Sequence, residues 1–422
     1  MAATRVRPAV PHWAALYLAV IQFFFVTTWI IYVIFLPTLA ESVGIPREMS
    51  VWILVLDQLT FTFTDFLLGF MADRVGRFMG RVGPFIVGLT AVSCLAFFAM
   101  PHIAAVGSGP VASGLFLFVI VIWVVSSSAL RAPPWVFLCR YSADTTLPWL
   151  SALYFTGLSV GNAASAYLGV ALRNQDPRLP FAVSSVTLFA VTIGLIWVER
   201  TLQARREIGG AGVADRESLA ADHALPPLAT PASTAFLAAA ALLSLGFQAN
   251  IAFNAIPQYL RYAQPSDLDY LLPLFWVGFN ITTFPAAALA PRWGGARVLV
   301  LASALGGLGT LLAALSPNLV GTMLGQIMVG GGWGAVLMAG LATALHLGRT
   351  GREGAISGLW FSTQSIAAFL RIGVVALQLD RAPNFPDLTR WAAPILWLGA
   401  GVVLAGLAWQ ARDARPRLAG SL

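Results

Sequence analysis

Long apolar runs alternate with short polar stretches along almost the whole chain. Twelve of these runs are long enough to cross the hydrocarbon core of a bilayer, about 30 Å thick, as helices. A helix suits this position because it satisfies its own backbone hydrogen bonds in lipid. The predicted spans are Trp13–Leu36, Val51–Ala72, Val82–Met100, Ser113–Leu138, Trp149–Leu172, Phe181–Val198, Ser233–Pro257, Leu268–Ala290, Val298–Leu315, Val320–Leu345, Ala355–Leu377 and Trp391–Gln410.

One connection, between the sixth and seventh predicted spans, is much longer than the others. It reads "ERTLQARREIGGAGVADRESLAADHALPPLATPAS" and is charged, rich in Ala, Gly and Pro, and poor in large apolar residues. Such a composition cannot bury enough surface to pack as a domain. We therefore predict an all-α membrane protein with twelve transmembrane helices in two pseudo-symmetric six-helix bundles, residues 1–199 and 233–422, joined by a cytoplasmic linker at 200–232.

Composition and charge agree with a membrane protein. Of the 422 residues, 58% are hydrophobic and 10% are charged, whereas soluble domains carry about 25% charged residues. A formal charge of +7 could suggest nucleic acid, but all 25 basic residues are arginine and most lie in short loops between apolar runs. They concentrate on the side that holds both termini, which predicts cytoplasmic termini in a bacterial inner membrane and no nucleic-acid partner.

No motif for metal, nucleotide or covalent catalysis is present in the sequence. Cys94 and Cys139 form no disulfide framework or metal-ligand spacing, and the four histidines are isolated. The glycine-rich "GQIMVGGGWG" lies in a predicted span and lacks the Lys-Ser/Thr of a phosphate loop. We expect no enzymatic activity, no cofactor, no metal, and a monomeric chain that uses an ion gradient rather than ATP.

The most informative motif lies in "DFLLGFMADRVGRFMGRVGPFI", residues 65–86. Gly69 allows a neighbouring helix to approach closely, and Gly76 and Gly80 permit a tight turn. Asp73 suits the positive end of a neighbouring helix, while the arginines suit anionic headgroups. Gly69-x-x-x-Asp73-Arg74-x-Gly76-Arg77 resembles the cytoplasmic loop signature of the major facilitator superfamily.

That resemblance implies the major facilitator fold and alternating access between two halves. It also implies a latch for one access state, formed by Gly69, Asp73, Arg74, Gly76, Arg77, Gly80 and Arg81. The second half carries a degraded copy, "LAPRWGGARV", in which Arg292 matches Arg74, Gly294 matches Gly76, and Pro291 replaces Asp73. Such a repeat is typical of secondary transporters.

Three short stretches resemble one branch of that superfamily, the glycoside–pentoside–hexuronide:cation symporters and the related sucrose carriers. They are the motif around Asp65, "PPWVFLCRYSAD" after the fourth span, and "REGAISGLW" at the eleventh. The chain departs from the branch at Phe61, where a second acid is usual, and at "STQS", where a lysine is frequent. The resemblance implies a sugar-like solute and coupling to H⁺ or Na⁺.

Four ionisable residues fall at membrane depth, where charge is costly and therefore marks function. Asp57 and Asp65 lie on the second predicted helix, Arg131 on the fourth and Arg371 on the eleventh. Their depths favour the pairs Asp65–Arg131 and Asp57–Arg371. Our hypothesis is that Asp65 takes up the coupling cation and Arg131 releases it; the alternative is a permanent ion pair that holds helices in register.

Solute contacts are expected on the first, fourth, seventh and tenth helices, which line the cavity in this superfamily, and on the eleventh. Amides hydrogen-bond hydroxyl groups and aromatic rings stack on sugar faces, so a neutral hydroxylated solute fits. The candidates are Tyr17, Gln22, Tyr32, Trp123, Asn250, Asn254, Gln326 and Gln364. Two rival functions stay open: proton-driven efflux of drug-like or amphipathic compounds, and a transporter-like fold that serves in assembly or in lipid or pigment handling.

Overall fold

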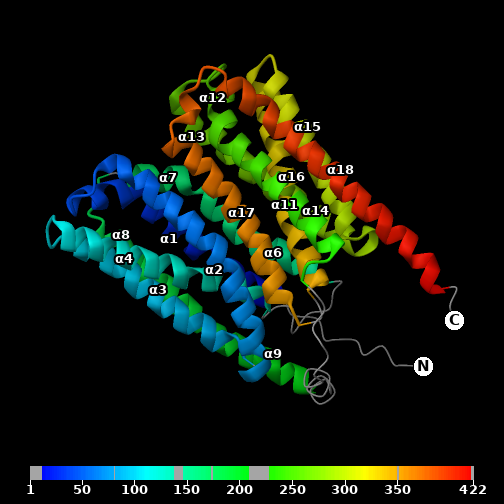
Figure 1. Cartoon of the computed structure of the whole chain (residues 1–422), viewed down its shortest axis with the longest axis horizontal. Helices are drawn as coiled ribbons and strands as arrows, with labels where there is room; N and C mark the ends of the chain where they lie inside the picture. Colours follow the sequence, from blue (N-terminus) through cyan, green and yellow to red (C-terminus); the bar gives the residue numbers. More distant parts are fainter. Residues whose placement is uncertain are drawn as a thin grey trace. The chain divides into compact units, whose positions relative to one another are not determined.

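The computed structural model describes residues 12–79, 81–136, 146–172, 174–208, 228–348 and 351–419. All regular elements among these residues are helices (Figure 1). The chain divides into two compact units: unit 1 is Met1–Pro226 with Leu345–Ser362, and unit 2 is Pro227–Ala344 with Thr363–Leu422. Most of the predicted linker lies outside the described residues, and the division into two six-helix bundles stays a prediction.

Unit 1 holds the helices of the first half of the chain together with the beginning of α17. The first helix, α1, packs against α6 and α8, and α3 packs against α4 and α8. The elements are α1 (His12–Ser42), η1 (Arg47–Met49), α2 (Ser50–Met79), α3 (Gly83–Ala104), α4 (Pro110–Ser127), η2 (Ser128–Leu130), α6 (Leu147–Ala163), α7 (Ser165–Leu172), α8 (Arg178–Ile193) and α9 (Leu195–Ile208).

Unit 2 holds the helices of the second half, and its long C-terminal helix α18 packs against α11 and α15. The elements are α11 (Pro231–Ala249), η3 (Asn250–Asn254), α12 (Ala255–Tyr259), η4 (Pro265–Asp267), α13 (Leu268–Leu271), α14 (Pro273–Trp293), α15 (Gly295–Leu315), α16 (Leu319–Leu347), α17 (Glu353–Ala376), η5 (Leu379–Arg381) and α18 (Phe385–Ala419). Helix α17 continues from unit 1 into unit 2, since the boundary falls after Ser362.

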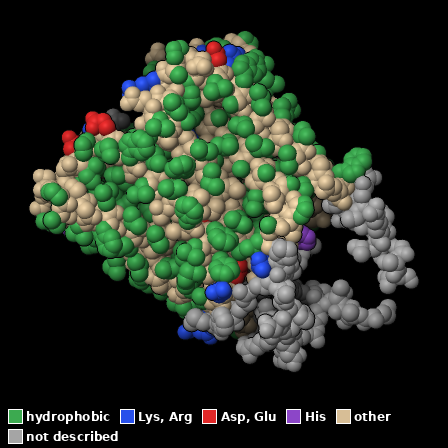
Figure 2. All heavy atoms as spheres, viewed as in Figure 1, with side chains coloured by type: hydrophobic (Ala, Val, Ile, Leu, Met, Phe, Trp, Pro, Cys, Tyr) green, Lys and Arg blue, Asp and Glu red, His purple; other side chains and the backbone are tan. Residues whose placement is uncertain are grey.

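The hydrophobicity of these helices identifies a multi-pass membrane protein. Among the described residues, eleven helices are long and apolar enough to cross a membrane. Hydrophobic side chains cover most of the face shown in Figure 2, and large ones such as Phe63, Leu95 and Val402 are more than 60% exposed. Exposure of such side chains to water is unfavourable, whereas their exposure to lipid is favourable.

The predicted span Trp149–Leu172 is not among these eleven helices. The structure divides it into α6 and α7, with a break at Ala164. The amide of Ala164 still bonds to the carbonyl of Val160, at 3.0 Å, so the chain bends there without leaving that amide unsatisfied. Helix α6 has 17 residues and α7 has eight, fewer than the roughly 20 of a usual transmembrane helix, and twelve complete spans therefore stay a prediction.

Helix α2 shows how a sequence that resembles a strand becomes a helix in lipid. Its "TFTFT" alternates polar and apolar residues, a pattern that in water favours a strand. Here the hydroxyls of Thr60, Thr62 and Thr64 each donate to the carbonyl oxygen four residues earlier, at 2.8–2.9 Å. This back-bonding satisfies the hydroxyls within the helix. The helix can then carry Asp57, Asp65 and Asp73 on one continuous frame.

Aromatic side chains fill the core of unit 1. Tyr32, Phe61, Phe97 and Trp123 are each at most 2% exposed and belong to one hydrophobic cluster. The rings of Phe97 and Phe181 stack with centroids 4.2 Å apart. Aromatic pairs of this kind add about 1 kcal/mol each beyond the burial of their area. The cluster holds α1, α2, α3, α4 and α8 together and includes Tyr32, whose hydroxyl bonds to Asp57.

Candidate functional site

The fourth helix is interrupted inside the predicted membrane span. Helix α4 ends at Ser127, a 3₁₀ turn follows at Ser128–Leu130, and Arg131 comes next. Pro133 and Pro134 explain the interruption, since a proline has no N–H to bond with the carbonyl four residues earlier. The freed carbonyl oxygen of Leu130 instead accepts a hydrogen bond from the hydroxyl of Tyr154, at 3.3 Å. Broken helices at this depth are typical of transporter binding sites.

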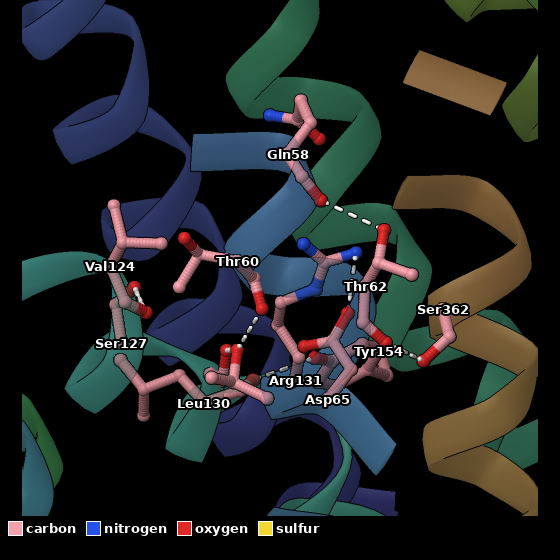
Figure 3. Close-up of polar contacts among 12 residues, drawn as sticks. Gln58, Thr60, Thr62, Asp65, Val124, Ser127, Leu130, Arg131, Tyr154 and Ser362 are labelled. Atoms are coloured by element: carbon pink, nitrogen blue, oxygen red, sulfur yellow. Dashed lines mark hydrogen bonds and ion pairs between the residues drawn. The ribbon is translucent and has the colours of Figure 1, made fainter. Parts of the chain in front are cut away.

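Arg131 and Asp65 form an ion pair beside this interruption (Figure 3). The distance from Arg131 Nη2 to Asp65 Oδ2 is 3.3 Å, and the side chains are 17% and 0% exposed. The guanidinium carbon also lies 4.7 Å from the centre of the Phe61 ring and 5.6 Å from that of Phe361. The structure thus brings together two residues that the sequence places at similar depth, while the coupling role of Asp65 stays a prediction of the sequence analysis.

Hydroxyl and amide groups surround the ion pair. Thr64 and Ser128 hydroxyls hydrogen-bond across α2 and η2 at 2.7 Å. The Tyr154 hydroxyl donates to Gln22 Oε1 at 2.6 Å, and the Ser362 hydroxyl donates to the Thr62 carbonyl at 2.6 Å. Tyr154 was not among the predicted site residues, although an aromatic hydroxyl on the span after a Pro-Pro break is a recognisable signal. Gln22 therefore has an internal partner and is 5% exposed.

Asp57 lies deep in unit 1 and has a different environment. The Tyr32 hydroxyl donates to Asp57 Oδ2 at 2.7 Å, and the two residues are 0% and 1% exposed respectively. Tyr32 packs against Trp123 with ring centroids 4.4 Å apart. Tyr32 and Trp123, both predicted solute contacts, belong to this packed core. Arg371 belongs to unit 2, so the predicted Asp57–Arg371 pair stays a prediction.

The predicted latch is built around Asp73, which is 4% exposed. Its two carboxylate oxygens accept hydrogen bonds from the backbone amides of Gly354 and Ala355, at 2.7 and 2.8 Å. These amides open α17, so the carboxylate caps the positive end of that helix. Arg74 lies over the ring of Phe70 at 4.7 Å.

The remaining members of the predicted latch are more peripheral or lie outside the described residues. Arg81 is exposed. The side chain of Arg77 and all of Gly80 lie outside the described residues, and Gly76 is described only as part of α2. The contacts of Asp73 with α17 are therefore described, while the latch role of these residues stays a prediction.

Glu199 is a capping residue that the sequence analysis did not single out. Its carboxylate accepts hydrogen bonds from the amides of Val82 and Gly83, at 2.8 and 3.0 Å, and the residue is 1% exposed. Those amides begin α3, whose own N-cap side chain forms no capping bond. A helix start at Gly83-Pro84 without a local Ser, Thr, Asp or Asn is the signal that a cap must come from elsewhere.

The amides predicted to contact solute in unit 2 bond to one another. Asn250 Nδ2 donates to Gln326 Oε1 at 2.9 Å, and Gln326 Nε2 donates to Gln258 Oε1 at 3.0 Å. Asn254 donates to the carbonyl of Thr389 at 2.9 Å. Asn250–Asn254 is a π-helix, a rare element that is frequent at functional sites.

Two predicted solute contacts remain, Tyr17 and Gln364. Tyr17 donates its hydroxyl to the carbonyl oxygen of Val191 and so joins α1 to α8. Gln364, on α17 in unit 2, is partly exposed. Among the described residues, no group of three or more His, Cys, Asp or Glu side chains is placed to hold a metal ion.

Comparisons with known proteins agree with this architecture. The family model described as Major Facilitator Superfamily matches residues 18–370, while no curated protein sequence matches significantly. The solved structure of the human organic anion transporter MFSD10 (TETRAN) has a TM-score of 0.67 at 12% identity, covering 95% of this chain and 99% of that one.

The Escherichia coli fucose:proton symporter FucP is also similar in structure. A variant of it has a TM-score of 0.64 at 14% identity, covering 93% of this chain and 97% of that one. FucP in the outward conformation has a TM-score of 0.62, with the same identity and coverage. At such identities the likeness shows the fold alone. With the family match extending over most of the chain, this protein belongs to the Major Facilitator Superfamily and is a transporter rather than an enzyme.

Proposed function

We propose that the protein is a cation-coupled secondary transporter that takes up a small polar organic solute, sugar-like in chemistry, across a bacterial inner membrane. Both termini face the cytoplasm in this proposal, and the chain acts as a monomer through alternating access. The observation that carries it is the Asp65–Arg131 ion pair beside the break in α4. A charge pair at membrane depth is costly, and transport is the usual function that retains one.

The surroundings of the pair support a polar solute. Hydroxyls of Thr64, Ser128 and Tyr154 lie around it, and the amides of unit 2 form a second polar group. One similar structure is described as a fucose:proton symporter, which is consistent with a sugar-like solute. The resemblance to the glycoside–pentoside–hexuronide branch points the same way and stays a prediction.

A second candidate is transport of an organic anion. The Arg131 guanidinium keeps 17% of its side chain exposed beside a completely buried carboxylate, so it offers positive charge to a solute. Another similar structure is described as an organic anion transporter. Efflux of amphipathic compounds has less support, since the rings of Tyr32, Phe61 and Trp123 are packed in the core of unit 1. A role in assembly or in lipid or pigment handling has less support because the ion pair Asp65–Arg131 is present.

The test is a thermal-unfolding screen of the purified protein, followed by uptake into proteoliposomes. The panel holds neutral sugars, organic anions and amphipathic drugs, each at two pH values and with or without Na⁺. We expect a sugar to raise the melting temperature and to accumulate when a proton or sodium gradient is imposed. Stabilisation by organic anions alone supports the second candidate. Accumulation of drugs against their gradient would overturn the proposal in favour of efflux.

A further inference from the structure

Asp57 has a single hydrogen-bond partner among the described residues, the hydroxyl of Tyr32 at 2.7 Å. Its exposure is 1%, and no ion pair joins it to a described cation. Asp65, two turns further along α2, has an arginine 3.3 Å away. Asp57 and Asp65 therefore differ in whether a positive charge lies beside the carboxyl group.

Within unit 1, the described elements packed against α2 offer Asp57 no positive charge. The part of α17 in that unit, residues 353–362, carries one ionisable side chain, the acid Glu353. From α1 the facing titratable group is Tyr32 itself. Helix α4 and η2, Pro110–Leu130, contain no ionisable side chain. On η1, Arg47 and Glu48 are both exposed. Asp65 is about 12 Å away along the helix axis, from eight residues at 1.5 Å rise. Arg371, its predicted partner, lies in unit 2.

Aromatic rings pack around Tyr32, the hydrogen-bond partner of Asp57. Trp29 and Trp123 stack with centroids 5.6 Å apart, and both pack against Tyr32. Phe61 closes the same cluster and is 2% exposed. An ionised carboxylate without a counter-charge is strongly disfavoured in such surroundings, so the group takes up a proton instead. Asp65 needs no added proton, because its negative charge is balanced by Arg131, which does not lose its proton in proteins.

We propose that Asp57, hydrogen-bonded by Tyr32, is the proton-binding group of this transporter, and that Asp65 is a positioning residue that holds Arg131. The proposal rests on the proposed function and names the coupling cation as H⁺. In the binding step a hydronium ion donates its proton to a carboxylate oxygen of Asp57, forming an O–H bond and leaving water. Release to water on the other side reverses the step, and Tyr32 keeps its own proton throughout.

The ligand set around Asp57 also argues against sodium. Hard metal cations need a shell of several oxygen ligands. Among the described residues Asp57 has one oxygen partner, the Tyr32 hydroxyl, and the rings of Trp29 and Trp123 pack against that tyrosine. A proton needs one oxygen atom and little space, so it fits where a metal ion does not.

Infrared spectroscopy of the purified protein during a pH titration tests the proposal, since a protonated carboxyl group has its own C=O band. The experiment needs no solute. We expect the wild type to show such a band that titrates, Asp57→Asn to lose it, and Asp65→Asn to keep it. Persistence of the band in Asp57→Asn, its selective loss in Asp65→Asn, or its absence from the wild type would overturn the proposal. The last result is what an Asp57–Arg371 ion pair would produce.

Tyr32→Phe supplies a second variant in case Asp57→Asn does not fold. It keeps the ring and the acid and removes the hydrogen bond. Since a hydroxyl binds the two forms of a carboxyl group unequally, the midpoint of the titration should move by about one pH unit, a tenfold change in proton affinity. Tryptophan fluorescence reports the same transition through Trp29 and Trp123. An unmoved midpoint contradicts the assignment.

Transport assays separate this proposal from the proposed function. Gradient-driven accumulation that is undiminished in Asp57→Asn overturns the proton-binding role while the protein remains a coupled transporter. A wild type that titrates at Asp57 but accumulates none of the panel solutes contradicts the proposed function and supports proton binding. The Glu41→Gln variant, at an exposed position at the end of α1, is the matched control for removal of a carboxylate.

Discussion

Gly69 on α2 and Gly354 on α17 approach so closely that a Cβ atom on either would collide with the carbonyl oxygen of the other. Gly358, one turn further along α17, lies against the backbone of Asp65 and Phe66 in the same way. Small residues four apart allow helices to make such contacts in membranes. The contact brings the amides of Gly354 and Ala355 to the carboxylate of Asp73, so glycine packing and helix capping depend on each other.

Replacing Gly69 with alanine should therefore force α2 and α17 apart. Overpacking of this kind costs about 1–3 kcal/mol, so the melting temperature in detergent should fall and transport should slow. Gly88→Ala is the matched control, because a Cβ at Gly88 meets no atom within 4 Å; alanine's better helix propensity should leave its melting temperature unchanged or raised. Equal effects of the two substitutions would contradict the close approach.

Asp73→Asn should weaken the cap on α17. Asparagine keeps one acceptor oxygen but turns an NH₂ group toward the second amide, and it removes the negative charge from the positive helix end. The loss of one charge-assisted hydrogen bond corresponds to about 1.5–3 kcal/mol. We expect a lower melting temperature and slower turnover in proteoliposomes, with solute binding retained. Glu48→Gln, at an exposed position on η1, should behave as wild type, and an Asp73→Asn protein that does likewise would exclude the latch.

The ion pair beside the α4 break predicts strong coupling between two substitutions. Asp65→Asn removes the carboxylate that faces Arg131, and breaking a buried pair in this way costs about 3–5 kcal/mol. The double variant Asp65→Asn/Arg131→Gln removes the stranded charge and should recover most of the melting temperature, as a double-mutant cycle would show. If the two effects simply add, the residues do not interact. Loss of transport in both variants together with a stable double variant assigns the pair to function.

Sequence patterns could predict much of the fold, because apolar runs and arginine placement respond to the bilayer itself. Eleven helices with span-like length and hydropathy follow directly from that pattern. The break at Ala164 was not predicted, because alanine is the best helix former and no proline marks the position, although Gly161, Asn162 and Ser165 lie beside it.

Side-chain partners were harder to predict than helices. Depth along a helix is readable from residue spacing, which is why Asp65 and Arg131 could be matched. Residue spacing does not reveal how far each helix is rotated about its own axis. That rotation decides whether an amide side chain faces the solute or another amide. Gln22, Asn250 and Gln326 all have side-chain partners inside their own unit. Glu199 was overlooked because its partners are backbone amides more than a hundred residues earlier in the chain.

The amide network of unit 2 leads to a prediction that separates structure from solute binding. Gln326 accepts from Asn250 through Oε1 and donates to Gln258 through Nε2, and all three residues are at most 3% exposed. Gln326→Met keeps the shape but leaves both partners unsatisfied, at a cost of about 1–3 kcal/mol for each group. The melting temperature of the solute-free protein should therefore fall well below that of Gln410→Met, which changes an exposed glutamine.

The double variant Asn250→Leu/Gln326→Met completes this test. Because the two amides are partners at 2.9 Å, the loss of the second should cost less once the first is gone, and the cycle should give a coupling free energy of about 1 kcal/mol. A direct solute contact would behave differently: Gln326→Met would then lower the affinity for the solute and leave the melting temperature of the solute-free protein unchanged. That outcome would identify Gln326 as a solute-binding residue and show that its hydrogen bonds to Asn250 and Gln258 add little to stability.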